Sequence, residues 1–103
     1  MPTYVLMTKL TPAALQGTSG RRATGHDWKA RVDAACPGLK WLGHYALLGP
    51  YDFMDIYEAP DEATAFRVSL LSRENGALSA ESWPAVAYPA FLGIADAVEG
   101  KRG

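Results

Sequence analysis

The sequence has little cysteine, no long apolar run and no excess of charge of either sign, and each absence excludes a class of protein. Of its 103 residues only Cys36 is a cysteine, which excludes an internal disulfide and a multi-cysteine metal site within one chain. No stretch approaches the roughly 20 consecutive apolar residues of a transmembrane helix. The formal net charge of -1 argues against nucleic-acid binding, which depends on clustered Lys and Arg.

The start of the chain and the overall composition indicate where such a protein resides and how many domains it has. The apolar run from Met1 to Met7 is too short for the core of a signal peptide and lacks preceding basic residues. We therefore expect a cytoplasmic protein without membrane contact. The length and the 49% hydrophobic content are typical of one globular domain. We predict a single domain over residues 1–103, with a core at 1–86 and a C-terminal helix and tail at 87–103.

Hydrophobic periodicity predicts four strands and three main helices in the order β-α-β-β-α-β-α. Strands are expected over residues 3–9, 39–48, 51–58 and 77–83, the last limited by Pro84. Helices are expected over residues 26–36, between an Asp61 cap and Asn75-Gly76, and from Pro89 onward. Residues 11–15 could begin a helix that a glycine-containing loop at 16–25 interrupts. In the helix after Asp61, one apolar face carries Ala63, Phe66, Leu70 and Leu71.

This order of elements predicts an α+β, ferredoxin-like βαββαβ fold with an extra C-terminal helix. Its helices lie on one face of an antiparallel sheet. The other face must then be covered if it carries apolar side chains, and a second copy of the chain is the simplest cover. A domain of this size buries only a modest core, so we expect a homodimer.

The hairpin region resembles a known family. The run Gly49-Pro50-Tyr51-Asp52-Phe53, followed by Glu58-Ala59-Pro60-Asp61, is similar to the signature of the GYD-domain family, and residues 1–12 resemble its first strand and turn. The resemblance implies the dimeric α/β-barrel group, in which two sheets face each other and which includes isomerases, cofactor-free oxygenases and haem enzymes. It transfers no catalytic residue. The interrupted first helical region departs from the family pattern.

The register of the hairpin suggests a candidate site. If Gly49-Pro50 is a two-residue connection, His44 lies opposite Asp55, and directly opposed residues point to the same face. The face expected to be left for a cavity or partner carries Leu42, His44, Ala46, Phe53, Asp55 and Tyr57. The more uniformly apolar face, which we assign to the helices, carries Trp41, Tyr45, Met54 and Ile56.

A histidine beside a carboxylate is a plausible general-base pair. His44 would be the catalytic base, and Asp55 would fix its tautomer. Phe53, Tyr57 and Leu42 would line the ligand pocket, as apolar walls around a few polar groups are usual in small-molecule sites. The commoner alternative is a cross-strand hydrogen bond that specifies register or partner orientation.

Three functions remain open at this point. The first is a homodimer that binds a small apolar ligand, with cofactor-free proton transfer as the reaction it could catalyse. The second is a non-catalytic association or regulatory module, and the third is a haem-binding protein. We expect no metal or cofactor, because no local ligand spacing suggests one. Arg21 and Arg22 could clamp a carboxylate or phosphate, although a solvated loop is the commoner role.

Overall fold

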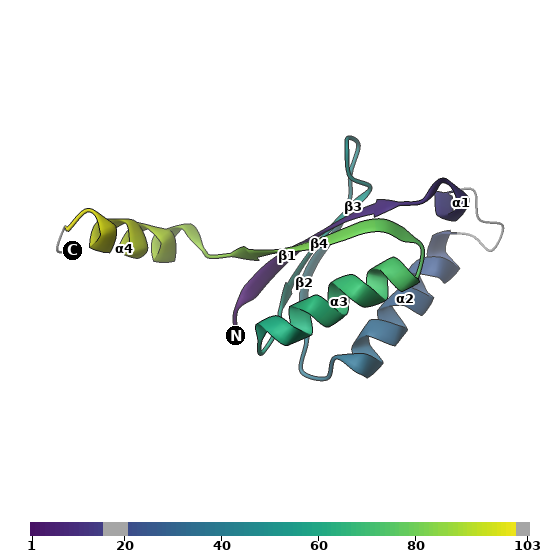
Figure 1. Cartoon of the computed structure of the whole chain (residues 1–103), viewed down its shortest axis with the longest axis horizontal. Helices are drawn as coiled ribbons and strands as arrows, with labels where there is room; N and C mark the ends of the chain where they lie inside the picture. The colour runs from purple at the N-terminus through teal and green to yellow at the C-terminus, as the bar shows by residue number, and fades with distance from the viewer. Residues whose placement is uncertain (16–20, 101–103) are drawn as a thin grey trace.

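The computed structural model describes residues 1–15 and 21–100 and has a four-stranded antiparallel sheet with helices packed on one face (Figure 1). The strand order is β2-β3-β1-β4, and the sheet is open and does not close as a barrel. This confirms the α+β, ferredoxin-like fold. In chain order the elements are β1 (Thr3–Leu10), α1 (Pro12–Leu15), α2 (Arg21–Ala35), β2 (Lys40–Ala46), β3 (Phe53–Glu58), α3 (Glu62–Glu74), β4 (Ala77–Ala85) and α4 (Tyr88–Val98). Among the described helices, none has the length and apolar character needed to cross a membrane.

Local signals fix the ends of α3 as predicted. The Asp61 carboxylate accepts the backbone N–H of Thr64 over 2.8 Å, which satisfies one of the donors left free in the first helical turn. At the other end the Asn75 N–H donates to the Leu71 and Ser72 carbonyls. Gly76 then takes a positive φ of 102°, a conformation that glycine adopts without steric cost.

Several predicted boundaries are wrong. The hairpin strands are shorter than expected, since β2 ends at Ala46 and β3 begins at Phe53. Helix α2 begins at Arg21 rather than at residue 26, so Gly25 lies inside a helix instead of in a loop; residues 16–20 of the expected loop lie outside the described residues. Strand β4 continues through Pro84 to Ala85. Proline is tolerated there because β4 is an edge strand, where a missing donor need not break a ladder bond.

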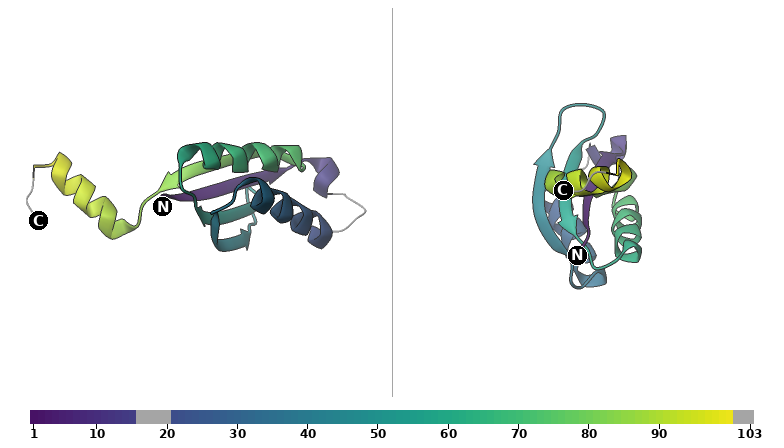
Figure 2. Two further views of the ribbon diagram at one scale, coloured as in Figure 1. Left: turned by 90° about the horizontal axis from the view of Figure 1, so that it is seen from below. Right: turned by 90° about the vertical axis from the view of Figure 1, so that its left-hand side faces the viewer.

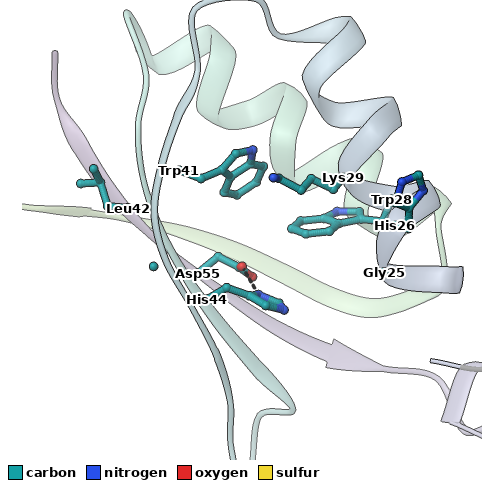
Figure 3. Close-up of a pocket in the computed structure, with 9 residues that line it drawn as sticks. Gly25, His26, Trp28, Lys29, Trp41, Leu42, His44 and Asp55 are labelled. Carbon is teal, nitrogen blue, oxygen red and sulfur yellow. Dashed lines mark hydrogen bonds and ion pairs between the residues drawn. The ribbon is translucent and has the colours of Figure 1, made fainter. Parts of the chain in front are cut away.

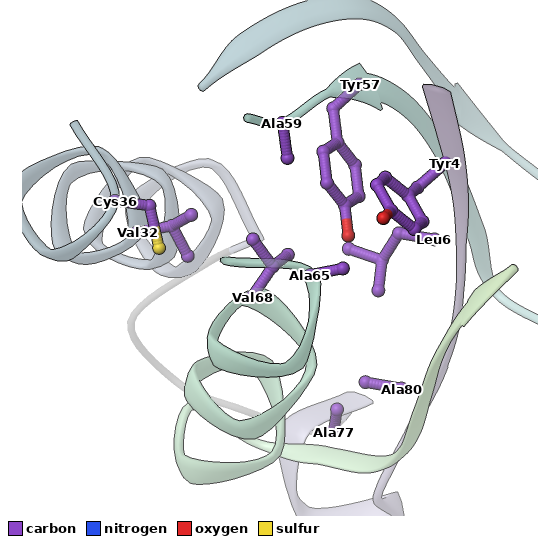
Figure 4. Close-up of a cluster of buried hydrophobic side chains, with 10 residues drawn as sticks. All are labelled: Tyr4, Leu6, Val32, Cys36, Tyr57, Ala59, Ala65, Val68, Ala77 and Ala80. Atoms are coloured by element: carbon purple, nitrogen blue, oxygen red, sulfur yellow. The ribbon is translucent and has the colours of Figure 1, made fainter. Parts of the chain in front are cut away.

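The core lies between the sheet and α2 and α3 (Figure 4). Tyr57 is fully buried at its centre, stacks on Tyr4 with ring centroids 5.5 Å apart, and donates its hydroxyl to Ser82 Oγ over 2.8 Å. Burial raises the pKa of Tyr57 to about 12. The buried cluster consists of Tyr4, Leu6, Val32, Cys36, Tyr57, Ala59, Ala65, Val68, Ala77 and Ala80.

The buried face of α3 differs from the predicted one. Thr64, Ala65, Val68 and Ser72 are buried, whereas Phe66 and Leu70 are exposed. Of the four residues of the predicted face, Leu71 alone packs against the core, so the sequence pattern selected a largely wrong helix face. The small side chains of the true face fit close packing against the sheet, where Ser72 also accepts a hydrogen bond from α2.

The β2–β3 hairpin keeps the predicted register near its tip and loses it at its base. His44 pairs with Asp55 and Ala46 with Phe53, and the Leu47 N–H donates to the Asp52 carbonyl beyond the strand ends. Between Trp41 and Gly43 the register shifts by one residue, so Trp41 rather than Leu42 pairs with Tyr57. Such a β-bulge inserts an extra residue and re-aims the side chains beyond it.

The bulge and the core together reverse the predicted assignment of the sheet faces. The face covered by the helices is the one that carries Trp41, His44, Asp55 and Tyr57. The outer face carries Val5, Met7, Tyr45, Met54, Ile56 and Trp83. The His44 face is therefore not the one available for facing a second sheet.

Helix α4 projects beyond the end of the sheet and packs on no other described element closely enough to bury a residue (Figures 1 and 2). Its exposed side chains include Tyr88, Phe91, Leu92, Ile94 and Val98. The projection makes the molecule long, with principal extents of 57 × 31 × 18 Å. The radius of gyration of 15.9 Å exceeds the roughly 13 Å expected for a compact chain of this length.

Candidate functional site: a cleft between α2 and β2

An open cleft of about 540 Å³ lies between the N-terminal half of α2 and the edge strand β2 (Figure 3). Its position follows from the topology, since β2 is an edge strand and α2 crosses above it. The lining residues are Gly25, His26, Trp28, Lys29, Trp41, Leu42, Gly43, His44 and Asp55.

The polar base of the cleft is the pair His44 and Asp55. The Nδ1 atom of His44 is hydrogen-bonded to Oδ1 of Asp55 across the hairpin. Only 2% of Asp55 is exposed, whereas the His44 side chain is largely open to solvent. Burial raises the pKa of the Asp55 carboxyl, and the hydrogen bond and charge of His44 oppose that rise.

This arrangement leaves one ring nitrogen of His44 available to a ligand. With Nδ1 directed at Asp55, Nε2 points away from the carboxylate (Figure 3), and the ring is largely exposed to solvent. A carboxylate acceptor favours the tautomer that carries the proton on Nδ1. In the neutral ring Nε2 can then accept a proton, which is the geometry that a general base requires.

The walls of the cleft are two tryptophans held by the chain itself. Trp28 Nε1 donates to Ser72 Oγ and Trp41 Nε1 donates to Asp33 Oδ1, each over 2.8 Å. The two indoles lie 5.2 Å apart between centroids. Since both N–H groups are already bonded, the indoles offer the cleft apolar ring surface and no donor.

The imidazole of His44 is itself part of an aromatic row. It is near-parallel to Trp28, with centroids 6.4 Å apart, and stacks on Phe53 at 5.8 Å. Two cationic or protonatable side chains, His26 and Lys29, reach the cleft from α2. In Figure 3 the amino group of Lys29 extends toward Trp41, above the His44–Asp55 pair.

The site residues expected from the sequence are only partly brought together here. His44, Asp55 and Leu42 line the cleft, with Leu42 half-exposed at the β-bulge. Phe53 lies behind His44 and supports its ring, while Tyr57 belongs to the core and not to the cleft. Reasoning from the sequence missed Trp28, Trp41 and Lys29 as cleft residues, because their proximity depends on how α2 packs across the sheet.

The structure gives no support for a reactive cysteine or a metal site among the described residues. Cys36 is buried in the core, and this burial raises the pKa of its thiol, which keeps it protonated and unreactive. Within residues 1–15 and 21–100, no three His, Cys, Asp or Glu side chains gather closely enough to hold a metal ion. Side-chain positions of Arg21 and Arg22 lie outside what the structure describes.

The fold and the cleft define a small α+β, ferredoxin-like domain with an aromatic cleft at the edge of its sheet. The chain belongs to the GYD-domain family, whose model matches residues 4–95. A similar protein is the glutamine synthetase and cystathionine beta-lyase binding protein of Thermus thermophilus, 27% identical over 86 residues, which cover 84% of this chain and 90% of the relative. No solved structure matches the chain significantly.

Proposed function

We propose that the protein is a small-molecule-binding homodimer, with the His44–Asp55 cleft as its ligand site. The observation that carries this proposal is the exposed imidazole of His44, oriented by a buried carboxylate beneath two fixed indoles. Apolar walls with a few convergent polar groups are the usual makeup of a small-ligand site. Because Trp28 and Trp41 are held by Ser72 and Asp33, little side-chain ordering would oppose binding.

Proton transfer is the chemistry that this cleft would support without a cofactor. His44 Nε2 would take a proton from a carbon acidified by a neighbouring carbonyl, and Asp55 would stabilise the imidazolium that forms. Returning the proton to a second carbon would complete an isomerisation. In this reading His44 is the catalytic residue and Asp55 positions it, while Phe53 and Leu42 shape the surroundings.

The surface area supports self-association. The chain exposes 6990 Å², about 1,300 Å² more than the roughly 5,700 Å² expected for a compact monomer of 11.1 kDa. A stable interface buries about 800 Å² on each partner. Apolar side chains such as Ile94 and Phe91 on α4 and Trp83 on the outer sheet face are exposed. We assign that surface to a second copy of the chain.

The second candidate is a non-catalytic association module that binds other proteins. The name of the Thermus thermophilus relative, a binding protein for two enzymes, favours it, as does the unburied helix α4. In that case the apolar surface of α4 would serve a different protein. A binding or association module fits these observations better than any specific enzyme.

Binding and self-association can be tested separately on the same samples. Ligand screening by NMR, with a library of small aromatic and carbonyl compounds, should find compounds that shift the NMR signals of Trp28 and His44. The His44→Ala variant should lose those hits but keep the mass of the dimer in analytical ultracentrifugation. The matched control is Phe66→Ala, an exposed side chain on α3 outside the cleft. Loss of the dimer in His44→Ala would instead assign His44 a structural role, and a screen without hits on a stable oligomer would favour the association module.

A further inference from the structure

The free polar groups of the cleft carry information about the charge of its ligand. Among the described residues that line the cleft, Asp55 alone has a carboxylate, and it is buried and bonded to His44. On α2, the Asp33 carboxylate accepts the indole N–H of Trp41. Each of these two carboxylates thus already accepts a hydrogen bond from another side chain of the chain.

The remaining polar side chains in the described lining are Lys29 and His26, together with the exposed ring of His44. Lys29 forms no ion pair or hydrogen bond with any residue that the structure describes, and its amino group lies beside Trp41 in Figure 3. His26 lies on the same rim, and His44 presents Nε2 from below. A lysine whose charge has no partner in the fold offers a point charge to an incoming anion.

The shape of the cleft selects the remainder of the ligand. Trp28 and His44 present near-parallel ring planes from opposite sides of the opening, with Trp41 beside them. Flat π-systems pack favourably against such ring faces in offset or edge-to-face geometry. An aliphatic chain would gain burial but none of this directional attraction. Since the indole N–H groups are used, selectivity for a polar substituent falls to Lys29 and His44.

We propose that the cleft binds a small flat organic anion, an aromatic or conjugated carboxylate, with its ring against Trp28 and His44 and its carboxylate at Lys29. This inference rests on the proposed small-molecule function and adds the charge and shape of the ligand. An unsaturated carboxylate also suits the proton transfer proposed above, because a neighbouring cation stabilises the negative charge that develops when His44 removes a proton.

The test compares two probes of equal shape, phenylacetate and the neutral phenylacetamide, by titration of the ¹⁵N-labelled protein. The indole N–H signals of Trp28 and Trp41 should shift, while that of Trp83, which donates to Glu81 away from the cleft, stays in place. Phenylacetate should bind about fivefold more tightly than phenylacetamide, the size of effect expected from one partly screened charge. The preference should shrink in about 1 M salt.

The variant Lys29→Met separates the charge from the packing. It keeps an unbranched apolar stem, so phenylacetamide affinity should be unchanged while phenylacetate falls to the same level. Lys40→Met is the control, since that amine pairs with Glu58 over 3.9 Å and does not line the cleft. Equal binding of both probes at Trp28 and Trp41, unaffected by Lys29→Met, would overturn the anion inference and leave small-molecule binding intact. Absence of any shift at about 10 mM of either probe would overturn both.

Discussion

The Asp52 carboxylate accepts the backbone N–H of Leu10 over 2.8 Å, and the Asp52 N–H donates to the Thr8 carbonyl over the same distance. Asp52 thus ties the connection after β2 to the end of β1. At that end the pairing of β1 with β4 changes register, between Lys9 and Leu10. Beside it, Tyr51 donates to Glu81 over 3.0 Å and contacts Trp83 edge-on. The residues that resemble the family signature therefore clamp the hairpin to β1 and β4, which is a structural role.

Replacing Asp52 with alanine should destabilise the fold. The Leu10 N–H would lose a charge-assisted hydrogen bond, and we expect a loss of about 2 kcal/mol in the free energy of unfolding. Asp52→Asn, which keeps an acceptor oxygen without the charge, should lose less. Urea unfolding followed by circular dichroism measures both. Asp27→Ala, in an exposed position on α2, is the control and should change little. Equal stability of Asp52→Ala and the parent protein would contradict the clamp.

The buried hydroxyl of Tyr57 should contribute a measurable hydrogen bond. Tyr57→Phe removes the donor to Ser82 Oγ and keeps the ring that stacks on Tyr4. Ser82 still has Ser69 as a partner, so we expect a loss of only about 1 kcal/mol. Thermal or urea unfolding reports the change. The same substitution at the exposed Tyr45 should fall within about 0.5 kcal/mol of the parent, and a similar loss at both positions would argue against this account.

The buried Asp55 should make stability depend on pH in a defined direction. Burial raises its folded-state pKa above 3.8, so the folded protein holds this proton more tightly than the unfolded chain. The stability from this group is therefore fully present below pH 3.8 and is lost as pH rises through the raised pKa. Asp55→Asn cannot titrate. We expect the parent protein to lose stability as pH rises through the raised pKa of Asp55, whereas Asp55→Asn does not. The unfolding free energy of Asp55→Asn minus that of the parent, measured in urea from acidic to neutral pH, should therefore increase with pH. A constant difference between the two proteins would show that Asp55 does not titrate with folding.

The exposed apolar surface of α4 should control self-association. Ile94→Asp places a charge on that surface and should convert the proposed dimer largely to monomer in analytical ultracentrifugation at micromolar concentration. Leu70→Asp is the matched control, because Leu70 is 56% exposed and Ile94 54%, but Leu70 lies on α3 away from the outer sheet face. Phenylacetate binding at Trp28 should persist in both variants. A dimer that survives Ile94→Asp but not Leu70→Asp would move the interface to α3.

Much of the fold could be read from local sequence. The order of strands and helices follows from short-range periodicity, and the ends of α3 follow from Asp61, Asn75 and Gly76, whose roles depend only on neighbouring backbone. The pairing of His44 with Asp55 could be counted from the hairpin tip, because each step away from the turn advances both strands by one residue.

The sequence misled where the answer depended on distant contacts. Both faces of the hairpin carry apolar side chains, so alternation could not say which one α2 and α3 would cover. The extra residue at the Leu42 bulge then moved Trp41 to the helix side, where it contacts Tyr57. Likewise, the apolar residues Phe66 and Leu70 were no guide to the buried face of α3, which uses small side chains for close packing.

By itself, then, the sequence determined the element order, the caps of α3 and the cross-strand neighbours nearest the hairpin tip, all of which rest on interactions within a few residues or across one turn. Long-range packing sets which sheet face is buried, and it brings Trp28, Trp41 and Lys29 to His44 at one cleft. Trp28 comes to His44 because its indole N–H is bonded to Ser72 on α3, a contact 44 residues apart in the chain. Packing of that range depends on the shape of the whole core, which no local pattern encodes.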